Sequence, residues 1–182
     1  MKNLLLIVLL CGASLVSGNS DYPVLYVLRV HPIIKTPERA EIQFKLFASH
    51  LSLLESSGDW KIINSLGMLG KYQFSVSTLE ILGYHNITPE KFKADPSIFS
   101  EAMQEQALRD LMQYNERYLK RFASFIGQII NGTLITKAGL LGAAHLAGVG
   151  GVQRFLTSAH NATDINGSSV QKYLNEFQNY NV

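Results

Sequence analysis

The feature that most constrains the fold is an amphipathic helix predicted to begin at Pro37. Thr36 can cap this helix, Pro37 takes the first helical position, and Glu38 adds an acid to the first turn. The apolar residues that follow recur at spacings of three and four, and they are Phe44, Phe47, Leu51 and Leu54. Gly58 supplies the signal that ends the helix. The sequence therefore predicts a helix with one buried face, and Glu55 lies in its last turn.

The rest of the folded region is also predicted to be helical, apart from a loop or short hairpin at residues 65–75. Apolar spacing and capping residues predict further helices over 77–82, from Ser97 to Ile130 with a break near Gly127, from Thr136 to Ala147 with a stop at Gly148, over 152–157, and from a Ser168–Gln171 capping box to Tyr180. The long region should bury Ala102, Leu108, Leu111, Leu119, Phe122 and Ile126. We therefore expect a mainly α domain of the α+β kind.

The N-terminus has the residue order of a secretory signal. Lys2 precedes an apolar run from Leu4 to Leu10, and small residues follow through Gly18. The run is too short for a membrane-spanning helix, which needs about 20 apolar residues. We expect cleavage before Asn19 and a secreted or periplasmic protein. Membrane anchoring through an uncleaved signal or through Cys11 is the less favoured alternative.

Length and composition predict three segments: a signal peptide at 1–18, an extended segment at 19–36, and one domain at 37–182. Cys11 is the only cysteine and leaves with the signal, so the fold must rest on its core rather than on disulfides. A net charge of +2 without a basic stripe argues against a nucleic-acid partner. No metal or other cofactor is expected, and we expect a monomer. Four histidines show no ligand spacing: His31, His50, His85 and His160.

Glu55 is the candidate for acid chemistry. A carboxylate in the last turn of a helix faces the negative end of the helix dipole, which disfavours its ionised form. Partial burial beside Trp60, Tyr72 or Phe74 would act in the same direction. A glycosidase acid needs this, because it must hold a proton near neutral pH and pass it to the leaving oxygen. The alternative is a solvated carboxylate with no chemical role.

The stretch that begins at Glu55 resembles the catalytic motif of soluble lytic transglycosylases and goose-type lysozymes. That motif is Glu-Ser, a polar residue nine positions on, glycines at twelve and fifteen, and glutamine at eighteen, matched here by Glu55, Ser56, Asn64, Gly67, Gly70 and Gln73. The segment 143–148 is similar to the family's Ala-Ala-Tyr-Asn-Ala-Gly. Residues 106–115 resemble a helix that bears a Gln and an Asn, and 169–180 resemble the terminal helix with the active-site tyrosine. The ordered set spans roughly residues 37 to 180.

The resemblance implies a lysozyme-like catalytic domain over 37–182, in which the small loop or hairpin region forms one wall of a glycan cleft. It implies that Glu55 acts as general acid and then base, and that Tyr173 reaches toward it from the last helix. The implied substrate-binding residues are Asn64, Met68, Tyr72, Gln73, His145, Leu146, Ala147, Gly148 and Tyr173. His145 and Leu146 replace the family's Tyr-Asn, which puts a polar contact to the N-acetyl group in doubt.

The function implied is cleavage of β-1,4 bonds in peptidoglycan or a related glycan polymer. A lytic transglycosylase needs one acid and leaves a 1,6-anhydro end, which fits a chain with no convincing second carboxylate. Three alternatives stay open. The first is a lysozyme- or chitinase-type hydrolase in which Asp59 or another acid positions water. The second is a glycan-binding module without catalysis, and the third is a helical secreted protein whose motifs are coincidental.

Overall fold

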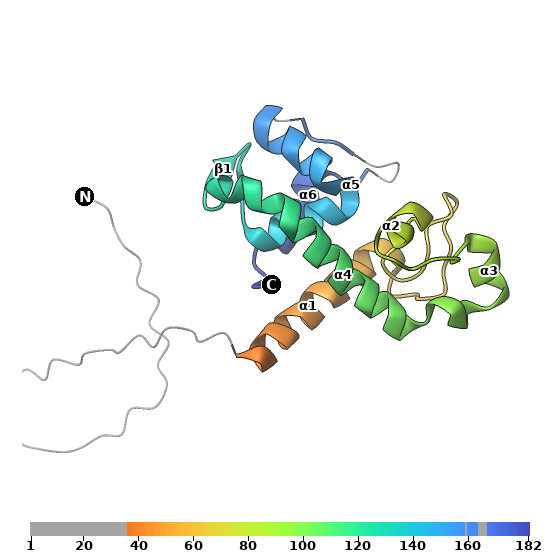
Figure 1. Ribbon diagram of the computed structural model, residues 1–182. Helices are drawn as coiled ribbons and strands as arrows, with labels where there is room; N and C mark the ends of the chain where they lie inside the picture. The colour runs from red at the N-terminus through yellow and green to blue at the C-terminus, as the bar shows by residue number, and fades with distance from the viewer. Residues whose placement is uncertain (1–35, 159, 164–166) are drawn as a thin grey trace, which may run out of the picture. The chain divides into compact units, whose positions relative to one another are not determined.

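A computed structural model describes residues 36–158, 160–163 and 167–182, which lie in one compact unit, Lys35–Val182. The predicted signal peptide and all of the extended segment except Thr36 lie outside the described residues. The elements, shown in Figure 1, are α1 (Pro37–Ser56), α2 (Val76–Ile81), α3 (Pro89–Ala94), the 3-10 helix η1 (Pro96–Phe99), α4 (Glu101–Leu119), the 3-10 helix η2 (Lys120–Phe125), β1 (Ile129–Ile130), β2 (Thr133–Leu134), α5 (Lys137–Ser158) and α6 (Val170–Phe177). This architecture confirms the predicted mainly α class.

Helix α1 begins and ends as the sequence predicts. The Thr36 side chain accepts a hydrogen bond from the Arg39 backbone N–H at 3.2 Å. The helix ends where Ser57 takes a left-handed conformation with φ of 56°. Leu54 was predicted to lie on the buried face, and this prediction is wrong, because the residue is 36% exposed. Successive helical residues are rotated by about 100°, and the observed face is centred between Leu51 and Ser52, so Leu54 falls at its edge.

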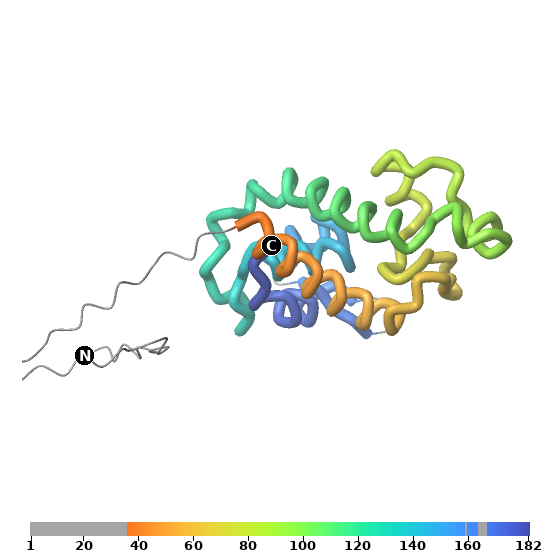
Figure 2. The backbone as a smooth tube through the Cα atoms, turned by 90° about the horizontal axis from the view of Figure 1, so that it is seen from below, coloured from red at the N-terminus to blue at the C-terminus, as the bar shows by residue number. Residues whose placement is uncertain are grey.

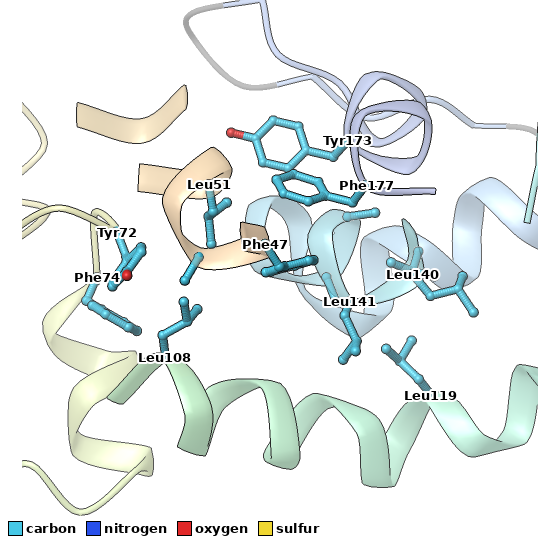
Figure 3. Packing of buried hydrophobic residues seen from close by; sticks show 14 of the residues in the cluster. Phe47, Leu51, Tyr72, Phe74, Leu108, Leu119, Leu140, Leu141, Tyr173 and Phe177 are labelled. Atoms are coloured by element: carbon cyan, nitrogen blue, oxygen red, sulfur yellow. The ribbon is translucent and has the colours of Figure 1, made fainter. Parts of the chain in front are cut away.

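Helix α1 packs its buried face between α4 and α6. Its Phe47 ring packs on Phe177 of α6 with centroids 4.5 Å apart, and its Phe44 ring lies under the Arg109 guanidinium of α4 at 3.5 Å. Figure 3 shows Phe47 and Leu51 of α1 with α4 on one side and α6 on the other. The C-terminal residues close over the start of α1, as Figure 2 shows. Helix α1 is therefore held from several directions.

The expected long helix from Ser97 to Ile130 is wrong in its second half. Helix α4 ends at Leu119, the chain continues as η2, and β1 and β2 form a short antiparallel hairpin. Asn131 and Gly132 stand at its turn with φ of 50° and 78°, which is the left-handed backbone of a tight hairpin turn. Of the core predicted here, Leu108, Leu119 and Phe122 are buried and Leu111 is partly buried, whereas Ala102 and Ile126 are exposed.

The later helices follow the prediction closely. Thr136 caps α5 by accepting from the Gly139 N–H at 3.1 Å. The predicted stop at Gly148 is a kink inside α5, where φ is 64° and ψ is 172°. The last helix is capped by Ser169 rather than by Ser168, one residue later than predicted. In Figure 1, α5 and α6 lie toward the end of α4, whereas α2 and α3 lie toward its start.

The loop between α1 and α2 is held in place by Gln104 of α4. The buried Gln104 amide donates to the carbonyls of Trp60 and Phe99 at 2.8 and 2.9 Å and accepts from the Lys71 N–H at 2.8 Å. Gly70 has a φ of 70°, and a Cβ atom there would overlap the Gln104 amide. Residues 63 to 74 carry isolated antiparallel bridges rather than full strands, which agrees with the expected loop or short hairpin.

Within residues 36–158, 160–163 and 167–182, no helix is both long and apolar enough to cross a membrane.

Candidate active site

Glu55 is held at the end of α1 by a tyrosine from the far end of the chain. The Tyr173 hydroxyl donates to Glu55 Oε1 at 2.6 Å, across 118 residues of sequence. The Glu55 side chain is 16% exposed, so it is largely enclosed and still reaches solvent. Tyr173 comes from the same face of α6 as Phe177, and its ring stands beside α1 in Figure 3. The structure thus brings Tyr173 to Glu55, as the resemblance implied, while the chemical roles of the two residues stay predictions.

His145 of α5 stands next to Glu55 and ties α5 to the loop before α2. Its Nε2 atom lies 2.9 Å from the Tyr72 carbonyl oxygen and 3.8 Å from Glu55 Oε1. Because a carbonyl oxygen only accepts, Nε2 carries the hydrogen and donates it to Tyr72. The other ring nitrogen, Nδ1, is buried and has no hydrogen-bond partner among the described residues. The ring meets Phe74 edge-on with centroids 6.1 Å apart, and the His145 side chain is 8% exposed.

A groove of about 540 Å³, which His145 helps to line, lies between the loop and the helices α2, α4, η2 and α5. This volume is within the range of roughly 300–1,000 Å³ that is usual for ligand sites. Five predicted site residues line the groove: Met68, Gln73, His145, Leu146 and Gly148. The other lining residues were not predicted to bind substrate: Ser75, Thr78, Ile81, Leu111, Tyr114, Asn115, Tyr118, Arg121, Ala144 and Val149. Of these, Asn115 and Ala144 fall in the stretches that resemble the family, and Leu111 was predicted as a core residue. The groove collects residues from four elements and could hold a short stretch of polymer.

Four predicted binding residues do not line this groove, namely Asn64, Tyr72, Ala147 and Tyr173, and neither does the predicted acid Glu55. The Asn64 side chain accepts from the Leu66 and Met68 backbone N–H groups at 2.8 and 3.0 Å, so it shapes the turn. Tyr72 is fully buried, so its side chain supports the site from behind. Gln73 reaches the groove, but its amide donates to the Gly70 carbonyl at 2.8 Å. Much of the motif therefore builds the loop rather than the surface that a ligand would touch.

A cluster of charged and polar side chains surrounds Glu105 of α4, behind the loop. The Tyr72 hydroxyl donates to Glu105 Oε1 at 2.7 Å, and Lys71 pairs with Glu105 and with Glu101. Burial raises the pKa of Tyr72 above its ordinary value of 10.0, and the hydrogen bond to Glu105 acts in the same direction. Burial by itself would lower the pKa of Lys71, but hydrogen bonds and attraction from Glu105 and Glu101 outweigh it and raise that pKa. This cluster fastens the loop to α4.

Sequence reasoning missed the α4 side of the groove. Tyr114, Tyr118 and Arg121 stand at positions i, i+4 and i+7, a spacing that places all three on one helical face. That periodicity was the signal available in the sequence. The described residues contain no group of three or more His, Cys, Asp or Glu side chains placed to hold a metal ion.

No protein-family model, characterised protein or solved structure shows a significant match to this chain.

Proposed function

We propose that this protein cleaves β-1,4 glycosidic bonds in peptidoglycan as a lytic transglycosylase, with Glu55 as the acid and then the base. The observation that carries the proposal is the surroundings of Glu55. This largely enclosed carboxylate accepts a 2.6 Å hydrogen bond from Tyr173, and it lies 3.8 Å from a histidine that lines the groove. A carboxyl group that accepts from a tyrosine hydroxyl and stands next to a residue of the groove is suited to exchange protons with a bound glycan.

The proposed reaction uses one carboxyl group twice. Protonated Glu55 gives its proton to the oxygen between N-acetylmuramic acid and the next sugar, and the bond from that oxygen to C1 breaks. The positive charge on the sugar ring is steadied by its own N-acetyl group. The Glu55 carboxylate then takes the proton from the C6 hydroxyl, and O6 bonds to C1 to close the 1,6-anhydro ring. Glu55 ends protonated, and no water is consumed.

No second carboxylate is placed at the groove. No Asp or Glu of the described residues lines it, and Glu55 itself lies 3.8 Å from His145 of the lining. Asp59, the candidate for positioning water in a hydrolase, is exposed, and its carboxylate accepts from the Lys61 N–H at 2.9 Å in a local turn. A hydrolase with two carboxylates needs the second one to reach the same bond. The hydrolase therefore stands as an outcome of the test rather than as a second proposal.

The test is digestion of purified peptidoglycan, with the released sugars analysed by mass spectrometry. We expect anhydromuropeptides from the wild-type protein and from Asp59→Asn. Glu55→Gln should lose them by about 10³-fold, because a general acid of this kind contributes roughly 10²–10⁴-fold. Glu55→Gln keeps the shape of the side chain, so its melting temperature should stay close to that of the wild type.

Other products would assign the chain differently. Reducing-end products that vanish in Glu55→Gln would keep the acid but make the protein a hydrolase, and loss of activity in Asp59→Asn would then identify the second carboxylate. Binding of peptidoglycan without release of sugars from the wild-type protein would contradict an enzyme and favour a glycan-binding module. Equal release from the wild type and Glu55→Gln would remove Glu55 from the mechanism.

A further inference from the structure

Helix α1 has a second apolar face, which the described residues leave uncovered. Ile42, Leu46 and Leu53 lie on this face, and they are 56%, 52% and 63% exposed. Successive helical residues are rotated by about 100°, so their spacings of four and seven place all three side chains within about 40° around the helix axis. The buried face of α1, on which Phe47 and Leu51 lie, is on the other side of the helix. Apolar residues therefore line two sides of α1, and only one side is packed.

We call Ile42, Leu46 and Leu53 the α1 stripe. The residue between them on the same line is Ser49, which is small and exposed. Lys45 stands beside the stripe and pairs with Glu41 at 3.8 Å, so charged side chains flank the stripe and do not interrupt it. A helix that is apolar on opposite sides is normally buried on both, and contiguous exposed apolar surface commonly marks an interaction site. The stripe is therefore a candidate docking surface.

The segment that precedes α1 has a residue pattern that matches the stripe. Residues 19–35 lie outside the described residues and are joined directly to the Thr36 cap. Apolar residues alternate in this segment, and they are Tyr22, Val24, Tyr26, Leu28 and Val30. Alternate residues of an extended chain are about 6.6 Å apart, which is close to the rise of about 6 Å between helical residues i and i+4. One face of an extended segment can therefore follow the stripe along the helix.

The segment is also long enough to cover the stripe. Helix α1 rises by about 26 Å from Thr36 to Leu53, at about 1.5 Å per residue. If the chain reverses near Pro32, residues 19–31 remain, and they span about 40 Å when extended. The covalent link to α1 also gives the segment an effective concentration in the millimolar range at this surface.

The area of the stripe fits such a segment better than a second copy of the chain. A stable dimer buries about 800 Å² on each partner. Three half-exposed aliphatic side chains offer on the order of 300 Å² of apolar surface, which is the size of patch found on ordinary monomers. An occupant that is already tethered needs less contact area, because it does not lose the freedom of a separate molecule when it binds.

We propose that residues 19–35 pack on the α1 stripe and cover the outer face of the helix that carries Glu55. In this arrangement Tyr26 and Leu28 lie against Leu46, and Val24 lies near Leu53. The contact is within one molecule. It does not depend on the chemistry proposed for Glu55.

The test is limited proteolysis of the exported protein with trypsin. Arg29 lies within the segment and provides a cleavage site, and mass spectrometry identifies the cut. Leu46→Asp should speed cleavage after Arg29 by at least about 10-fold, because an unpaired carboxylate disfavours the apolar contact and cleavage requires the open segment. The matched control is Leu66→Asp, since Leu66 is a 58% exposed leucine of the loop after α1. This control should cut at the wild-type rate.

A second measurement detects the contact directly. In a Cys11→Ser background the chain has no other cysteine. Tyr26→Cys combined with Leu46→Cys should form an intrachain disulfide at least about 10-fold faster than Tyr26→Cys combined with Ile81→Cys, because docking raises the local concentration of the first pair. Ile81 is 63% exposed on α2 and does not belong to the stripe. Melting temperatures show that each variant folds.

The proposal is overturned if trypsin cuts after Arg29 equally fast in the wild type and in Leu46→Asp, or if both cysteine pairs close at the same rate. A covalent dimer formed by Leu46→Cys alone would make a second copy the occupant, and binding to anionic phospholipid vesicles that Leu46→Asp abolishes would make it a membrane. Either result would also overturn the proposal. Failure to cut peptidoglycan would contradict the proposed function and leave both of these measurements unchanged.

Discussion

Two glutamates in this protein each accept a hydrogen bond from a tyrosine hydroxyl, but their other neighbours differ. Glu55 accepts from the Tyr173 hydroxyl at 2.6 Å, and Glu105 accepts from the Tyr72 hydroxyl at 2.7 Å. Glu105 also pairs with the Lys71 ammonium, whereas the basic side chain found beside Glu55 in the described residues is His145 at 3.8 Å. The hydrogen on its Nε2 is given to a carbonyl oxygen.

The difference lies in what each carboxylate holds together. Glu105 bonds to both Tyr72 and Lys71 and so fastens the loop to α4. Glu55 has a tyrosine hydroxyl and a histidine beside it, and its side chain is 16% exposed. We expect variants of the two clusters to separate activity from stability.

The largest expected effect comes from exchanging each glutamate for glutamine. Glu55→Gln should lower glycan cleavage by about 10³-fold with little change in stability, because it removes the acid and leaves the packing intact. Glu105→Gln should keep activity within about 10-fold and lower the free energy of unfolding by about 1–3 kcal/mol, because a charged hydrogen-bond acceptor is lost. Rates of muropeptide release and urea unfolding curves measure the two effects. Similar losses of activity in both variants would contradict the different roles expected for Glu55 and Glu105.

The next effect concerns the loop that both clusters share. Gly70→Ala should lower the free energy of unfolding by about 3 kcal/mol, because its left-handed backbone and the overlap with Gln104 act together. Gly83→Ala is the matched control: its φ is 89°, but no heavy atom lies within 4 Å of the added carbon. This control should lose only about 1–2 kcal/mol. Equal losses in urea unfolding would show that contact with Gln104 contributes nothing.

A smaller effect is expected from removing each tyrosine hydroxyl. Tyr173→Phe should reduce glycan cleavage by about 10-fold, since one hydrogen bond to the acid is lost while the ring stays in the core. Tyr72→Phe should leave the rate within about 3-fold, because its hydroxyl bonds to Glu105 behind the loop. Steady-state rates on the same peptidoglycan measure both. A larger fall in Tyr72→Phe than in Tyr173→Phe would reverse the assignment of the two clusters.

The smallest effect is a loss of stability in alkali that originates in the Glu105 cluster. The pKa values of Tyr72 and Lys71 are both raised in the folded protein, so the folded state keeps protons that the unfolded chain releases above about pH 10. The free energy of unfolding should therefore fall as the pH rises above 10 and approaches the folded values. Urea unfolding at about pH 9 and about pH 11 measures the slope. Tyr72→Phe should make it shallower, and an unchanged slope would contradict this origin.

Local signals predicted a large part of the fold. The start of α1 at Thr36, the cap of α5 at Thr136 and the break at Gly148 were all correct because each depends on neighbouring residues only. Other local signals were present and overlooked. Thr88-Pro89-Glu90 repeats the residue types that start α1, and it begins α3. Asn131-Gly132 between apolar residues is the strongest short signal of a hairpin, but the strand before it, Ile129–Ile130, was assigned to the end of a helix.

The site was predictable only in part, because its groups meet through tertiary packing. Resemblance to a family linked Tyr173 to Glu55, whereas periodicity could not have done so across 118 residues. Nothing in the local sequence joins Tyr72 to Glu105, which lies 33 residues away on another element. Burial of the Tyr72 ring depends on how the loop folds onto α4. The sequence thus predicted candidate site residues, and the fold decides which of them line the groove.

The long separation of Glu55 and Tyr173 also has a consequence for the life of the chain during synthesis. Helix α1 leaves the ribosome well before α6 and carries Glu55, but the hydroxyl that holds Glu55 belongs to α6, the last of the described helices. An incomplete chain therefore contains Glu55 without its partner and without the α5 wall of the groove. The candidate site comes into being only when the two ends of the domain have met, so a truncated or still unfolded chain has no assembled centre.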